Sequence, residues 1–141
     1  MAIPTKLTLE IVTPDHALVH EEVDEVEAPG ADGYFGVLPG HTPFLATLKV
    51  GQLWYRKGTE KFYLSIAFGF AEVLPDRVTI LAQIAERAED IDVKRAAAAK
   101  RRAEERLTKP VRDMDFERAR IALMKSLIRL QVAERVRMHR S

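Results

Sequence analysis

The segment LWYRKGTEKFYLSI at residues 53–66 decides the fold of the first half of the chain. Its two ends, residues 53–56 and 62–66, are short runs rich in β-branched, aromatic and aliphatic residues. They flank a polar loop, residues 57–61, with Gly58 near its centre. This pattern predicts a β-hairpin.

Similar short apolar runs, separated by turn residues, fill the first 81 residues. Leu7, Leu9 and Ile11 alternate with polar positions, and Val23 and Val26 belong to a second run. Further runs are residues 34–38, 44–50, 69–73 and 78–81, and Pro- or Gly-containing turns at 28–33, 39–41 and 75–76 separate them. Runs this short and regular predict a β-sandwich or barrel.

Beyond Glu86 the pattern becomes helical, because glycine is absent and proline occurs only at position 110. Asp90 or Asp92 can cap a first helix, and Pro110 ends it. Asp113 or Asp115 can cap a second helix that reaches about residue 138. We therefore predict an α+β protein, with a β-domain over residues 1–86 and a helical hairpin over 87–141.

Residue spacing predicts what each helix face contacts. On the first helix a narrow apolar stripe comprises Ala96, Ala99, Ala103 and Leu107. The stripe expected to face it on the second helix comprises Phe116, Ala119, Leu123, Leu127 and Leu130. A further strip on the second helix comprises Ile121, Met124, Ile128 and Val132. Spacing alone leaves open whether this strip packs on the β-domain or against another subunit.

The composition, 47% hydrophobic and 30% charged residues in 141, is that of a folded globular protein. Because cysteine is absent, disulfides, thiolate metal sites and a cysteine nucleophile are excluded. We expect no secretory signal in residues 1–10 and no membrane-spanning helix, since no apolar run reaches about 20 residues. The net charge of +1 averages an acidic first part and a basic part beyond Glu86, so we expect an anionic partner for the tail.

Residues that could carry catalysis are scarce. The four histidines, His16, His20, His41 and His139, lack metal-ligand spacing, and His16 and His20 are expected on a solvated surface. The sequence has no GxSxG, Walker A or GxGxxG motif. We therefore predict a non-catalytic protein.

Basic residues form two rows. Arg95, Arg102 and Arg106 lie within about 40° on the first helix, and Arg118, Lys125 and Arg129 do the same on the second. If the helices pair through their apolar stripes, these rows could border a groove for a polyphosphate or an acidic protein surface. The alternative is a solvated face with i, i+4 ion pairs, as is common for runs such as residues 100–106.

Two motifs resemble one family. Residues 33–43, GYFGVLPGHTP, followed by LKVG at 48–51, resemble the central signature of the ATP synthase epsilon subunits. Residues 91–96, IDVKRA, resemble that family's I/L-D-x-x-R-A motif. The resemblance implies a ten-stranded β-sandwich that binds the gamma subunit and the c subunits of the rotor ring. It also implies a mobile hairpin that inhibits ATP hydrolysis when it extends toward the alpha and beta subunits.

The resemblance implies two sets of site residues. The first, which would bind a regulatory ATP that is not hydrolysed, comprises Glu86, Ile91, Asp92, Arg95, Ala96, Arg102, Lys125 and Arg129. Lys125 stands where the nucleotide-binding pattern has arginine, so it keeps the charge but loses bidentate phosphate recognition. The second, at the interface with gamma and the ring, comprises Gly33, Tyr34, Gly36, Leu38, Pro39, Gly40, His41 and Pro43. From the residues themselves, Gly33, Gly36 and Gly40 are expected to be turn glycines that permit positive φ.

Other functions remain as alternatives. The hairpin could belong to a freestanding ATP-binding sensor. A nucleic-acid binder is disfavoured, because acids intersperse the bases and Phe116 is the only aromatic residue of the helices. The family reading implies no required cofactor, a peripheral place on the cytoplasmic face of a bacterial inner membrane, and membrane contact only through the complex.

Overall fold

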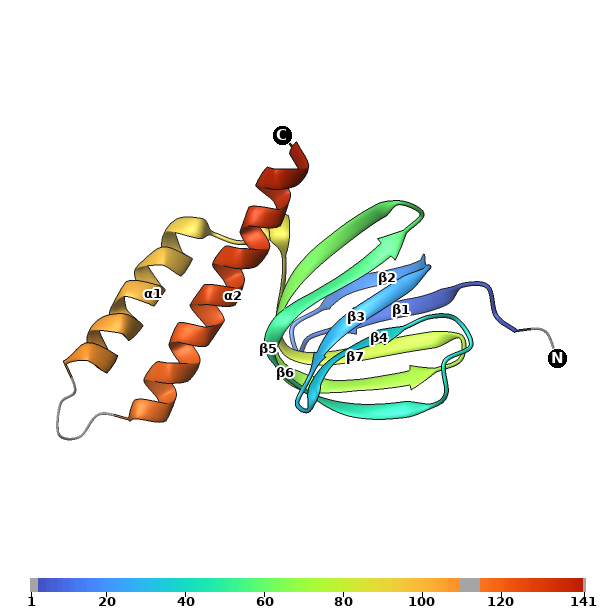
Figure 1. Ribbon diagram of the computed structural model, residues 1–141, viewed down its shortest axis with the longest axis horizontal. Coiled ribbons are helices and arrows are strands. Elements are labelled where there is room, and N and C mark those ends of the chain that lie inside the picture. Colours follow the sequence, from blue (N-terminus) through green and yellow to red (C-terminus); the bar gives the residue numbers. More distant parts are fainter. Residues whose placement is uncertain (1–2, 110–114, 141) are drawn as a thin grey trace. The chain divides into compact units, whose positions relative to one another are not determined.

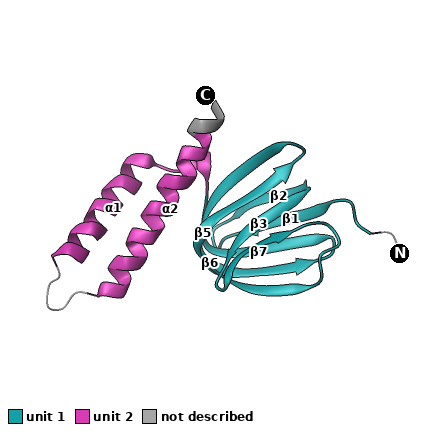
Figure 2. Ribbon diagram, viewed as in Figure 1, with its two compact units in different colours: residues 1–86 teal, residues 87–141 magenta. Residues whose placement is uncertain are grey.

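The computed structural model describes residues 3–109 and 115–140, with side chains up to residue 136. The chain divides into two compact units, residues 1–86 and 87–141 (Figure 2). The first contains the strands and the second the two long helices (Figure 1). The α+β class predicted from the sequence is confirmed.

The strands of the described residues form one sheet in the order β2-β1-β7-β6-β5-β3-β4. Their bounds are Leu7–Val12 (β1), Ala17–Val23 (β2), Glu25–Gly30 (β3), Gly33–Val37 (β4), Phe44–Lys57 (β5), Glu60–Leu74 (β6) and Arg77–Arg87 (β7). The β1–β2, β3–β4, β3–β5 and β5–β6 pairs are antiparallel, whereas β1 and β7 are parallel. The described part of the chain thus has seven strands, and the expected number of ten was wrong.

Two of the three missing strands are accounted for by β5 and β6, each of which joins two runs that the sequence suggests are separate strands. β5 passes through Gly51 without a break, and β6 passes through Phe68 and Gly69, whose φ angles are 64° and 139°. Positive φ bends the chain at this point, while the β5–β6 pairing resumes in the same register on both sides. A sequence pattern marks such a corner as a turn, although the hydrogen-bonded strand continues through it.

Alternating side chains of these strands form one core. Leu7, Leu9 and Ile11 are fully buried, as the alternation in the sequence predicted. The core is completed by residues of the other strands, among them Val26, Leu48, Leu53, Leu64, Ile66, Val73 and Ile80. Each fully buried aliphatic side chain contributes about 1.5–3 kcal/mol relative to exposure, so this core is the main source of the unit's stability.

The hairpin comprises a short 3-10 turn, Ala88–Asp90, helix α1, Val93–Thr108, and helix α2, Phe116–Arg140. Asp92 caps α1, because its Oδ1 accepts a hydrogen bond from the Arg95 N–H at 3.1 Å. Asp115 caps α2 in the same way, accepting from the Arg118 N–H at 3.1 Å. Of the capping alternatives, Asp90 lies in the 3-10 turn, while Asp113 and the predicted terminator Pro110 lie outside the described residues.

Small residues at heptad spacing form the buried faces of the two helices. They are Ala96 and Ala103 on α1, and Ala119, Ser126 and Ala133 on α2, all at most 8% exposed. The Ser126 hydroxyl donates to the carbonyl oxygen of Ala122 at 2.9 Å, so its burial leaves no unmet donor. Because the face of α1 offers little more than Cβ atoms, the helices can approach closely only where α2 is also small.

The predicted apolar stripe on α2 is therefore partly wrong. Phe116 and Leu127 are 54% and 44% exposed, whereas Leu123 and Leu130 are half-buried beside the small-residue face. The real seam is rotated from the predicted stripe toward Ser126, which hydrophobicity alone does not identify. In the second strip Val132 is buried and the other three members are half-buried, and the partner of this strip stays a prediction.

Candidate functional site

The first candidate surface lies on unit 1, at the turn after β4. Leu38, Pro39, Gly40 and His41 form a β-turn in which the His41 N–H donates to the Leu38 carbonyl oxygen at 3.2 Å. Gly40 has φ +87°, the conformation that favours glycine at the third position of a Pro-Gly turn. The Gly40 N–H donates to the Pro75 carbonyl oxygen at 2.7 Å, which fixes this turn to the β6–β7 turn.

The side chains of this region are largely available for contact. Tyr34, Leu38 and Phe44 are 49%, 54% and 43% exposed, and Pro43 is also exposed. His41 is half-buried, and its Nδ1 lies 2.6 Å from the Thr42 carbonyl oxygen. The Phe44 ring lies 5.3 Å from that of Phe35 in an edge-on arrangement, which anchors the end of the turn.

Two of the three predicted turn glycines adopt positive φ. Gly33, directly after the two-residue β3–β4 turn, has φ +135°, and Gly40 has φ +87°. Gly36 is different: it lies inside β4, pairs with Glu27 and has no positive φ. The expectation for Gly36 was therefore wrong. The chain turns before β4, at residues 31–32, and after it, at residues 38–41, so Gly36 itself is part of an extended strand.

A second exposed surface on unit 1 was missed in the sequence analysis. Leu45, Phe70 and Leu81 are 75%, 62% and 53% exposed on β5, β6 and β7. Leu81 pairs with the half-buried Val12 of β1, and Gly69, next to Phe70, lies against the Leu81 backbone. An apolar band thus crosses the adjacent strands β5, β6, β7 and β1, and we call it the outer band; its residues are Leu45, Phe70, Leu81 and Val12. Each strand shows this in the sequence only as one apolar residue at an outward position, and the band appears when the strands are aligned.

The predicted nucleotide residues lie mainly on the hairpin. Asp92, Arg95 and Arg102 are exposed, whereas Lys125 and Arg129 are half-buried. Ile91 and Ala96 are buried, at 8% and 0% exposure, so they shape the start of α1. Glu86 is half-buried near the end of β7, in the other unit.

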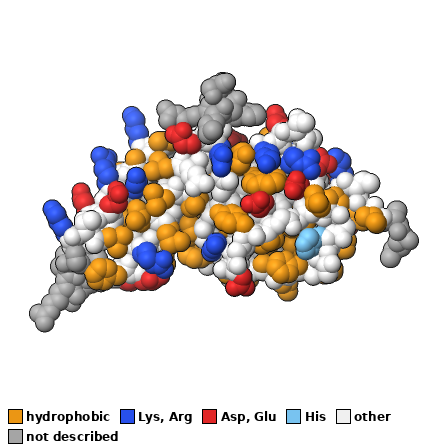
Figure 3. All heavy atoms as spheres, in the orientation of Figure 1, with side chains coloured by type: hydrophobic (Ala, Val, Ile, Leu, Met, Phe, Trp, Pro, Cys, Tyr) orange, Lys and Arg blue, Asp and Glu red, His pale blue; other side chains and the backbone are white. Residues whose placement is uncertain are grey.

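The geometry of the hairpin places its two basic rows on one face. At about 100° per residue, each row lies about a quarter turn from the small-residue seam, rotated in the same sense on both helices. The helices run antiparallel (Figure 1), so equal rotations in the same sense bring both rows to the same side of the pair. In Figure 3, hydrophobic side chains of the hairpin lie between Lys and Arg side chains.

The rows also correspond in part along the helix axes. Residues counted equally from the 109–115 connection lie at about the same level, which matches Arg106 with Arg118 and Arg95 with Arg129. Lys125 lies three residues further from the connection than Arg102, or about 4.5 Å at 1.5 Å per residue. The two rows therefore place cations along the same face of both helices, level at their ends and staggered between them.

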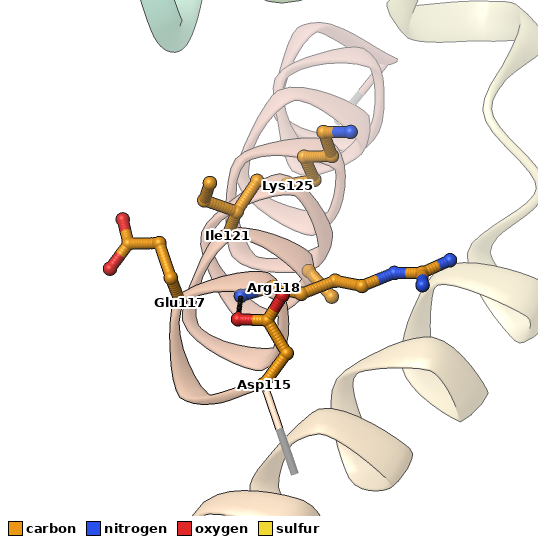
Figure 4. Close-up of a pocket in the computed structure, with 6 residues that line it drawn as sticks. Asp115, Glu117, Arg118, Ile121 and Lys125 are labelled. Carbon is orange, nitrogen blue, oxygen red and sulfur yellow. Dashed lines mark hydrogen bonds between the residues drawn. The ribbon is translucent and has the colours of Figure 1, made fainter. Parts of the chain in front are cut away.

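A depression of about 360 Å³ lies on this part of α2. It is lined by Asp115, Glu117, Arg118, Ile121, Ala122 and Lys125. Figure 4 shows Arg118 extending toward α1, while Glu117 points to the opposite side of α2. A second depression, of about 370 Å³, is lined by Arg102, Glu105, Arg106 and Lys109 of α1.

The described residues contain no group of three or more His, Asp or Glu side chains arranged to hold a metal ion. His16 and His20 are both exposed, and His20 Nε2 lies 3.5 Å from Glu10 Oε1, as expected for surface residues. In the part of the chain that the structure describes, neither long helix has an apolar stretch sufficient to cross a membrane.

Comparisons with known proteins match both units. The sequence profile of the ATP synthase Delta/Epsilon chain beta-sandwich domain matches residues 6–88. That of the Delta/Epsilon chain long alpha-helix domain matches residues 89–134. The chain is 54% identical to the ATP synthase epsilon chain of Syntrophobacter fumaroxidans over 130 residues, 92% of this chain and 97% of the relative. It is 50% identical over 126 residues to that of Nitratidesulfovibrio vulgaris, covering 89% and 94%.

Solved structures show the same architecture. A chain in the structure of the Euglena gracilis mitochondrial ATP synthase OSCP/F1/c-ring superposes with a TM-score of 0.71 at 25% identity, covering 100% of this chain and 85% of that one. A chain of the Tetrahymena thermophila ATP synthase central stalk and c-ring matches in fold, with a TM-score of 0.58 at 13% identity, covering 96% and 98%.

The structure thus defines a two-part α+β fold, in which a β-domain with exposed apolar side chains is followed by a helical hairpin with exposed basic side chains. The chain belongs to the ATP synthase delta/epsilon chain family, as one of its epsilon chains. The resemblance predicted from the motifs at 33–51 and 91–96 is thereby confirmed.

Proposed function

We propose that this chain acts in the central stalk of a bacterial-type rotary ATP synthase, where it links the rotor ring to gamma and restrains ATP hydrolysis. It carries out no chemistry itself. Unit 1 binds gamma and the c subunits, and the hairpin is the regulatory part that reaches the alpha and beta subunits. The chain is held at the cytoplasmic face of the membrane through these partners.

The observation that carries this proposal is the match of both units, in order, to the two domains of ATP synthase epsilon chains. The exposed surfaces support it. The turn at 38–41 and the outer band provide apolar area of the kind that marks protein interfaces. We assign the turn to the ring-facing interface predicted from the family signature, and the outer band to the stalk.

The regulatory role rests on the hairpin. Its seam consists of small residues, so opening it exposes less apolar area than a leucine-rich seam would. The two basic rows lie on one face, where a polyanion can contact both helices at once. A polyphosphate bound there favours the closed hairpin, so we propose that ATP stabilises the closed form and is not hydrolysed.

Truncation tests the proposal. The chain ending at Glu86 is compared with the full chain in an ATP synthase reconstituted from the remaining subunits of the same source. We expect both forms to bind the gamma and ring complex, and only the full chain to inhibit ATP hydrolysis. Full inhibition by the truncated chain would contradict the regulatory role, and failure of the full chain to bind would contradict the stalk role.

A further inference from the structure

The edge strand β4 is joined to β5 by a side chain that reaches over β3. In the sheet of the described residues, β4 lies at the edge and pairs with β3, which in turn pairs with β5. The Tyr34 hydroxyl nevertheless accepts a hydrogen bond from the Gln52 N–H at 3.1 Å. Tyr34 therefore connects two strands that are not neighbours.

This bond lies where the pairing between β3 and β5 is irregular. Glu27 pairs with Trp54 and Gly30 pairs with Leu48, so two residues of β3 lie opposite five of β5. One of the two is Pro29, which has no N–H and lies in the pair with Tyr34. The regular β3–β5 register is interrupted here, and within this interruption the Tyr34 hydroxyl accepts from the Gln52 N–H.

Gly51 leaves the space for this arrangement. A Cβ atom at position 51 would lie 2.5 Å from Pro29 Cβ and 2.7 Å from the Tyr34 hydroxyl oxygen. Both distances are shorter than van der Waals contact, so alanine would displace the phenol or the proline. The Lys49 ammonium lies 5.5 Å from the centre of the Tyr34 ring, where a cation is attracted to the ring face.

The contact also bears on the neighbouring turn. The Ala31 N–H donates to the Thr47 carbonyl oxygen at 2.7 Å, which fixes the start of β4, and the Gly40 N–H fixes the turn after it. Tyr34 lies between these two anchors, and its hydroxyl ties β4 itself to β5 by a hydrogen bond. Without this bond, β4 keeps its pairing with β3 but loses its direct link to β5 between the two anchors.

We propose that Tyr34 is a positioning residue for the docking surface at 33–43: it holds β4 and the turn 38–41 in the geometry that the rotor partner binds, and Gly51 provides its seat. This inference rests on the stalk role proposed above. It adds that the docking surface is preorganised by a phenol–amide bond, so that binding does not have to supply the ordering of β4.

The test uses Tyr34→Phe, which keeps the ring and removes the hydroxyl. The matched control is Tyr55→Phe, which removes the Tyr55 hydroxyl bond to Glu21 Oε2 at 2.9 Å in the same unit. Backbone hydrogen exchange is measured by NMR on the full chain, and affinity is measured against the complex of gamma with the c-ring.

We expect Tyr34→Phe to speed exchange at Gln52 and in residues 33–37, and to weaken partner binding about fivefold or more. Gly51→Ala should produce the same pattern more strongly. Tyr55→Phe should lower the free energy of unfolding about as much as Tyr34→Phe does, whereas its affinity for the partner should stay at the wild-type value.

Unchanged exchange in β4, or an equal loss of affinity in Tyr34→Phe and Tyr55→Phe, would overturn the positioning role. A wild-type chain that does not bind gamma and the ring would instead contradict the stalk proposal. In that case the exchange data still decide whether Tyr34 orders β4, because they need no partner.

Discussion

Gly69 lies directly against the backbone of Leu81, where a Cβ atom would overlap the Leu81 carbonyl oxygen and lie 2.8 Å from Ala82 Cα. With φ +139°, Gly69 also occupies a conformation that side chains disfavour. This contact between β6 and β7 is the corner at which the long strand bends.

Gly69→Ala should therefore be severely destabilising, by about 3 kcal/mol or more, since strain and a backbone clash add. Urea unfolding followed by the fluorescence of Trp54, the single tryptophan, reports on unit 1. Gly36→Ala is the matched control, because no heavy atom lies within 4 Å of a Cβ there. It should change the free energy of unfolding by less than about 1 kcal/mol. Equal losses in both variants would refute the assignment of the corner.

Asp24 gives unit 1 a predictable dependence on acid. The Gly58 N–H and the Lys6 ammonium, which hydrogen-bond its carboxylate, lower the pKa of Asp24 from its ordinary value. A carboxyl group whose pKa is lowered by folding stabilises the protein above its unfolded pKa, and this contribution disappears as the pH falls through the folded pKa. Asp24→Asn should thus be less stable than wild type at pH 6, and the difference should shrink steadily below about pH 4. Urea midpoints across this range measure it, with the exposed Asp15→Asn as control. A constant difference at all pH values would contradict the role of the charge.

The small-residue seam predicts that two substitutions in the hairpin destabilise it to different extents. Ala103 is 2% exposed, so Ala103→Leu inserts a larger side chain between the helices. It should lower the free energy of unfolding by about 2 kcal/mol, because the helices must separate. Leu127→Ala removes a side chain that is 44% exposed and should cost less than about 1 kcal/mol. Thermal unfolding followed by helical circular dichroism compares them. A larger loss in Leu127→Ala would support the stripe predicted from the sequence against the observed seam.

Neighbouring arginines on different faces of α1 test the ATP proposal. Arg102 belongs to the basic row, whereas Arg101 lies on another side of the helix, and both are exposed. Calorimetry with ATP on the full chain should show Arg102→Gln weakening binding about tenfold and Arg101→Gln changing it less than about twofold. Comparable effects of the two variants would indicate non-specific attraction to the positive hairpin.

Lys125 is the position at which the nucleotide site departs from the family pattern. Arginine presents a planar fork that bonds two phosphate oxygens, whereas lysine acts as a point charge. Lys125→Arg should therefore tighten ATP binding about threefold to tenfold in the same calorimetric experiment. Weaker or unchanged binding would place the phosphates elsewhere on the hairpin.

The two helix caps and the Tyr34 hydrogen bond show which kinds of contact can be predicted from the sequence. Asp92 and Asp115 act through backbone groups three residues away, so local sequence narrowed each cap to two candidates, and the structure selected between them. Tyr34 acts on Gln52, 18 residues away, where the β3–β5 register is interrupted. That contact depends on the register of three strands, which no local pattern specifies. The outer band was missed for the same reason, because its members meet only when four strands align.

The sequence by itself determined the class of fold, the division into a strand-rich part and a helical part, and the basic rows, and it narrowed each helix cap to two residues. These depend on periodicity and on hydrogen bonds between near neighbours, both of which are local. Only the tertiary structure decided that seven strands replace ten and that Gly69 and Gly51 are points of close approach. It also decided that the seam of the hairpin runs through Ser126. Each of these is set by the distance between two backbones, and that distance depends on packing across the whole unit.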